Sequence, residues 1–62
     1  MAKERLGRIL REERMIQMLT LEKAAKLTGV SMWKFLLMES GEETIPLEEY
    51  IHVVEALKVK LS

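Results

Sequence analysis

The stretch from Thr20 to Ser31, T-L-E-K-A-A-K-L-T-G-V-S, decides the fold. Thr20 is a favourable N-cap, because its hydroxyl accepts hydrogen bonds from backbone N–H groups of the following turn. Gly29 is the residue best able to adopt the left-handed backbone that ends a helix, and Ser31 is a second N-cap. We therefore expect a helix over 21–27, a short turn, and a helix from Met32 to about Ser40. This is the spacing of a helix-turn-helix at 20–40.

Helices are also expected on both sides of this pair. Upstream, apolar residues recur at roughly helical spacing from Glu4 to Met18. Downstream, Pro46 suits the first turn of a helix that continues to about Leu57. The tail over 59–62 shows no helix signal. The sequence therefore predicts a single all-α domain over 1–62, a bundle of four helices, or of five if the tail adds a short element.

Composition excludes several classes of protein. The 62 residues contain no cysteine and one histidine, His52, so neither a disulfide framework nor a zinc site is expected, and no metal or cofactor. Apolar residues make up 48% and charged residues 32%, which indicates a globular chain. No apolar run approaches a membrane span, so a cytoplasmic protein is expected. Ser31 lacks the base that a nucleophile requires, so no enzyme is predicted.

Charge and amide content add two hints. The net charge is zero, but residues 1–34 hold eight basic and four acidic groups, whereas residues 35–62 hold two basic and six acidic groups. Two interpretations stay open: a basic face for a polyanion, or ordinary solvated helix faces. The chain has no Asp, no Asn and one Gln but many Glu and Lys residues, which is typical of thermophiles.

From Leu6 to Leu61 the chain resembles the Cro/C1-type helix-turn-helix domains of phage repressors and bacterial regulators. The matching pieces are Leu6-Gly7, the segment Thr20–Ser31, Glu39 followed by Gly41, and Ala56-Leu57. The resemblance implies a prokaryotic transcription regulator that binds double-stranded DNA. It also implies a structural ion pair between Arg14 and Glu39. One departure stands out, since Leu21 occupies a position where that family commonly has a phosphate-binding Gln.

The central segment also resembles a second group, small archaeal and bacterial helix-turn-helix proteins regarded as antitoxins. The similar stretch is K-A-A-K-L-T-G-V-S-M-W-K-F-L, Lys23 to Leu36, followed by Ile45-Pro46. The pair Trp33-x-Phe35 favours this group over the general repressor pattern. The resemblance implies a toxin or other protein as a further partner.

The expected recognition helix is unusually apolar. Base edges are read by hydrogen bonds in the major groove, yet its exposed positions would be Met32, Trp33, Lys34, Leu36 and Leu37. The predicted DNA contacts are Arg8, Thr20, Lys23, Lys26, Ser31, Met32, Trp33, Lys34 and Leu37.

Three interpretations of this helix stay open. Its apolar side chains contact thymine methyls and sugars while basic residues hold phosphates. Alternatively they form a protein-binding patch, which would make the chain an interaction module that does not bind DNA. In the third interpretation, Trp33 and Leu36 pack on a second protomer.

A homodimer is expected from surplus apolar surface on the last helix. Its core stripe is read as Tyr50, Val54 and Leu57, which leaves Val53, Val59 and Leu61 as the predicted dimer interface. Burying aliphatic side chains favours association. Two recognition helices about one DNA turn apart would also match a palindromic site.

Overall fold

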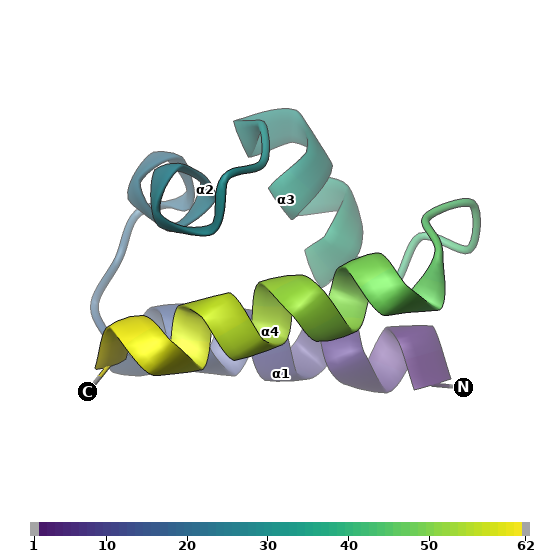
Figure 1. Ribbon diagram of the computed structural model, residues 1–62, viewed down its shortest axis with the longest axis horizontal. Coiled ribbons are helices and arrows are strands. Elements are labelled where there is room, and N and C mark those ends of the chain that lie inside the picture. Colours follow the sequence, from purple (N-terminus) through teal and green to yellow (C-terminus); the bar gives the residue numbers. More distant parts are fainter. Residues whose placement is uncertain (1, 62) are drawn as a thin grey trace.

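Two long helices form one layer of the fold, and two short helices form a second layer over them (Figure 1). The computed structural model describes residues 2–61 of the chain, with the side chains of residues 2–58. The helices are α1 (Ala2–Ile16), α2 (Leu21–Thr28), α3 (Met32–Glu39) and α4 (Leu47–Leu61). In Figure 1, α1 and α4 lie side by side and run in the same direction. The predicted all-α bundle is confirmed, and no described helix is long and apolar enough to cross a lipid bilayer.

The helix-turn-helix forms because residues next to the helix ends cap the start of each short helix and the C-terminal end of α2. The hydroxyl of Thr20 accepts from the backbone N–H of Lys23 at 3.1 Å, and that of Ser31 accepts from Lys34 at 3.0 Å. Gly29 adopts a left-handed φ of 78°, and the Val30 N–H then donates to the Ala25 carbonyl. The predicted caps and the turn over 29–31 are therefore confirmed.

Both long helices differ from their predicted bounds. α1 begins and ends two residues earlier than expected. It ends early because Met18 adopts a left-handed φ of 57° and the Leu19 N–H donates back to the Arg14 carbonyl oxygen. α4 runs to Leu61, so the prediction that helix is lost after Leu57 was wrong, and the described residues contain no fifth element. No glycine or proline follows Pro46, so nothing stops the helix there.

The core takes buried side chains from every helix and from the link before α4. Its buried members are Leu10, Ala24, Ala25, Phe35, Met38, Ile45, Tyr50, Val53, Val54 and Leu57. The placement of Val53 in a dimer interface was wrong, because this side chain is only 1% exposed. Positions 50, 53, 54 and 57 follow the spacing of a single helix face, so Val53 belongs to the stripe itself. The side chains of Val59 and Leu61 lie outside the described residues.

The absence of a side chain at Gly7 allows α1 to approach the end of α3. A Cβ atom at this position would lie 2.3 Å from the Met38 carbonyl oxygen and 3.0 Å from that of Glu39. These obstacles are backbone atoms, so they cannot rotate away as a flexible side chain would. Gly7 is therefore required by close packing, since its own φ is not in the left-handed region.

We expect Gly7→Ala to lower the free energy of unfolding by about 1–3 kcal/mol, the usual cost of overpacking. In an unobstructed helix the same change would stabilise by about 0.5–1 kcal/mol. Gly29→Ala is the comparison, because a Cβ atom at this position meets nothing within 4 Å. Its cost comes from the left-handed backbone alone, which should lower the free energy of unfolding by about 1–2 kcal/mol. Urea titrations of the three proteins measure both effects. A Gly7→Ala variant more stable than wild type would contradict the close approach.

Tyr50 ties α4 to the link that precedes it. Its ring is fully buried, and its hydroxyl donates to the Glu42 carbonyl oxygen at 2.9 Å. Burial raises the pKa of Tyr50 above its ordinary value of 10.0, and the negative charges of Glu42 and Glu43 raise it further. The folded protein therefore holds this proton more tightly than the unfolded chain does.

A raised pKa means that the contribution of Tyr50 to stability is complete below pH 10 and is lost as the pH rises above it. Below pH 10, the free energy of unfolding of Tyr50→Phe should be about 1 kcal/mol lower than that of wild type, because the hydrogen bond to Glu42 is lost. Above it, the difference between the two should shrink, while lysine titration affects both proteins alike. Thermal melts across this range measure the difference, and a constant gap would refute the role of this hydroxyl.

Candidate nucleic-acid interface

α3 turns one side into the core and leaves the other in solvent. Phe35 and Met38 are fully buried, whereas Trp33 is 68% exposed, Met32 54% and Leu36 42%. Ser31, the N-cap of the helix, is exposed beside them. We call the set Ser31, Met32, Trp33 and Leu36 the α3 face. It is mostly apolar, as expected from the sequence.

Two predicted contact residues do not join this face. Leu37 is half-buried and packs against the core, so it is less exposed than expected, and its DNA contact stays a prediction. Lys34 lies on the flank of α3 that turns toward α4, where its ammonium group forms an ion pair with the Glu49 carboxylate. The basic residue on α3 therefore has an intramolecular partner.

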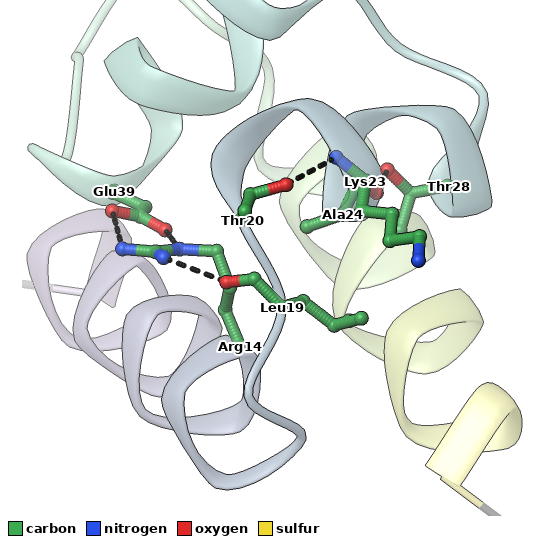
Figure 2. Close-up of polar contacts among 7 residues, drawn as sticks. All are labelled: Arg14, Leu19, Thr20, Lys23, Ala24, Thr28 and Glu39. Atoms are coloured by element: carbon green, nitrogen blue, oxygen red, sulfur yellow. Dashed lines mark hydrogen bonds and ion pairs between the residues drawn. The ribbon is translucent and has the colours of Figure 1, made fainter.

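Arg14 fixes the end of α3 against α1, as Figure 2 shows. Its Nε donates to Glu39 Oε2 at 2.6 Å, and a second guanidinium nitrogen lies 3.4 Å from Oε1. The third nitrogen donates to the Leu19 carbonyl oxygen at 3.0 Å. The Glu39 side chain is only 8% exposed and that of Arg14 18%, so the pair is largely removed from water. The predicted structural ion pair is confirmed.

An open pocket of about 350 Å³ lies between α1, the start of α2 and the end of α3. Its lining residues are Arg11, Arg14, Leu21, Leu36, Glu39 and Ser40. It joins the α3 face through Leu36 and the solvent-exposed side of α1 through Arg11. Because Glu39 balances Arg14, the charge of Arg11 is the uncompensated one at this pocket.

The predicted basic contacts on α1 and α2 lie on exposed helix surfaces. Arg8, Lys23 and Lys26 are exposed, and so is Arg11. Among the side chains of residues 2–58, these four form no ion pair, whereas Lys3 and Lys34 each pair with a glutamate. Arg11 shares the side of α1 that carries Gly7 and Arg14 and therefore faces α3, whereas Arg5 lies on the opposite side.

The sequence prediction missed Arg11, Leu21 and Ser40 as members of one pocket. Arg11 had a signal, because it shares a side of α1 with Arg14, which was predicted to pair with Glu39 at the end of α3. Leu21 and Ser40 are brought together only by the fold. The hydroxyls of Thr20 and Ser31, both predicted DNA contacts, accept capping N–H groups and keep their own protons available as donors.

This arrangement is suited to binding. It offers exposed apolar side chains, hydroxyl groups and unpaired cations, the kinds of group that contact sugars, thymine methyls and phosphates. Among the described residues, no group of three potential metal ligands lies close together.

Comparisons with known proteins leave the family open. No protein-family model matches the chain, and no curated protein and no solved structure matches it. The resemblance to Cro/C1-type domains and to the antitoxin group therefore stays a prediction from the quoted residues.

Arg14→Ala should lower the free energy of unfolding by about 3–5 kcal/mol, because it leaves Glu39 as a largely buried, unpaired charge. Arg5→Ala is the matched control, since Arg5 is exposed on the same helix and forms no ion pair among the described residues. Thermal melts of the two variants measure the difference, and equal melting temperatures would contradict the importance of the pair. In Arg14→Ala/Glu39→Ala the stranded charge is gone, so part of the loss should be recovered.

Proposed function

We propose that the chain is a DNA-binding transcription regulator that places α3 and the start of α2 against a duplex. The observation that carries this proposal is the exposed α3 face, which the pocket at Leu36 joins to the unpaired Arg11. Further unpaired cations on the exposed surfaces of α1 and α2 are Arg8, Lys23 and Lys26. A helix fits the major groove of B-form DNA, and α3 presents its exposed side without obstruction from another described segment. The cations on α1 and α2 are then available to the flanking phosphates.

The contacts divide into two kinds. Phosphate contacts from the four cations would supply most of the affinity and set the position of the protein on the duplex. Sequence preference would come from the α3 face, where Met32, Trp33 and Leu36 favour thymine methyl groups and the Ser31 hydroxyl donates to base edges. An apolar face of this kind discriminates by shape and methyl content more than by hydrogen bonding.

The proposed regulator is a binding protein without catalytic activity that acts in the cytoplasm as a homodimer. Since Val53 is buried, the dimer needs another contact. Exposed apolar side chains away from the α3 face supply two separate areas for it, one at and just after the end of α1 (Met15, Ile16, Met18) and one at the start of α4 (Leu47, Ile51). Dimerisation through these would leave both α3 faces free to contact adjacent turns of the same duplex.

A second candidate function is a protein-interaction module. The observation that favours it is again the α3 face, because three large exposed apolar residues on one short helix usually mark a protein interface. The similarity of Lys23–Leu36 to antitoxins makes a toxin the partner of first choice. This alternative does not require the unpaired cations on α1 and α2, and that difference separates the two functions experimentally.

DNA affinity should fall steeply with salt, by about 0.9 log units per log unit of salt for each phosphate contact. Arg11→Ala and Lys23→Ala should each reduce this slope by about one contact. The measurement is a fluorescence-anisotropy titration at several salt concentrations, with a duplex from the region upstream of the protein's own gene. Arg5→Ala is the control, because it removes the same charge from the far side of α1 and should leave the slope unchanged.

Two results would count against this function. No binding to the duplex at about 50 mM salt, where electrostatic contacts are strong, would favour the interaction module. A slope reduced equally by Arg5→Ala and Arg11→Ala would mean that the cations act through net charge alone, without the proposed docking of α3.

A further inference from the structure

The ion pair between Lys34 and Glu49 stands at the border of the α3 face. Lys34 follows Trp33 directly, and its backbone N–H donates to the Ser31 hydroxyl, so it is anchored in the first turn of α3. Its side chain is 39% exposed and that of Glu49 is 41% exposed. Both groups therefore remain open to solvent and to any ligand that covers α3.

α3 carries one basic residue, Lys34, and the ion pair with Glu49 occupies its ammonium group. Met32 through Glu39 contain one cation, Lys34, and one acid, Glu39, which is bound to Arg14. Lysine is a compact charge on a flexible four-carbon stem, so the ammonium of Lys34 can exchange one anionic partner for another without moving the helix. A DNA phosphate beside α3 and the Glu49 carboxylate are therefore competitors for the same ammonium group.

We propose that Glu49 is an intramolecular competitor of DNA, which holds Lys34 against α4 and thereby limits the affinity of the α3 face for a duplex. This inference rests on the proposed DNA-binding function and adds to it a positioning residue outside the helix-turn-helix. Glu49 acts through Lys34: each phosphate contact that Lys34 makes is offset by the loss of its ion pair. The four unpaired cations on α1 and α2 have no such partner, so their phosphate contacts are not offset in this way.

The size of the effect follows from the exposure of the pair. Solvent-exposed ion pairs are weak, so removing Glu49 should tighten DNA binding only about two- to five-fold. Removal of any acid near the duplex also reduces repulsion, and this general effect has to be separated from the release of Lys34. Glu48 provides the separation, because it lies in the same first turn of α4, is exposed, and forms no ion pair among the described side chains.

The experiment is a double-mutant cycle on DNA affinity. Wild type, Glu49→Gln, Lys34→Ala and the combined variant are titrated into a fluorescent duplex of mixed sequence about 30 base pairs long, about three helical turns. We expect Glu49→Gln to bind about two- to five-fold tighter than both wild type and Glu48→Gln. In the Lys34→Ala background, Glu49→Gln should produce no more than the Glu48→Gln effect. Lys34→Ala alone should weaken binding less than Arg11→Ala does.

Several results would overturn the inference. An equal gain in Glu48→Gln, or a gain that persists without Lys34, would show a general charge effect. A lower melting temperature of Glu49→Gln with unchanged affinity, while wild type binds the duplex, would assign the pair a structural role alone and leave the proposed function intact. If neither wild type nor Glu49→Gln binds DNA, both the inference and the proposed function fail.

Discussion

The guanidinium group of Arg14 joins three parts of the chain at one point. It binds the Glu39 carboxylate at the end of α3, donates to the Leu19 carbonyl oxygen of the α1–α2 link, and belongs to a residue of α1. About two turns earlier in α1, Gly7 lets the backbone of this helix approach the end of α3 closely. Because both ends of the helix-turn-helix are tied to α1 in this way, the orientation of α3 is set by α1 and by the core beneath.

The orientation of α3 decides which side chains are left for a partner. Phe35 and Met38 enter the core, so the α3 face turns outward and brings Leu36 to the pocket beside Arg11. Internal ion pairs occupy some of the basic residues, and the unpaired ones on α1 and α2 remain available. We propose a duplex as the partner because its bases carry methyl groups and its backbone is anionic, which suits exposed apolar side chains and unpaired cations. The same apolar surface also explains why a protein partner is the nearest physical alternative.

Local chemistry in the sequence was sufficient for the helix-turn-helix and for the fold class. Thr20, Gly29 and Ser31 act on backbone groups within a few residues of themselves, so their effect does not depend on the rest of the chain. The bounds of α2 and α3 therefore differ from the predicted ones by a residue at most. The apolar character of the α3 face was also evident from the sequence. The Arg14–Glu39 pair was predicted only through the family resemblance, because nothing local connects residues 25 positions apart.

Only the tertiary structure decided how the surface is used. Val53 was predicted to lie on the surface of the last helix, but its side chain is buried. The apolar stripe that packs on the core is wider than the three residues, Tyr50, Val54 and Leu57, from which it was predicted. Leu37 and Lys34 were expected on the DNA-binding surface, yet Leu37 packs on the core and Lys34 pairs with Glu49 of α4. Periodicity tells which residues share a side of one helix. Which neighbouring helix that side meets, and with which charges, depends on packing between segments distant in sequence.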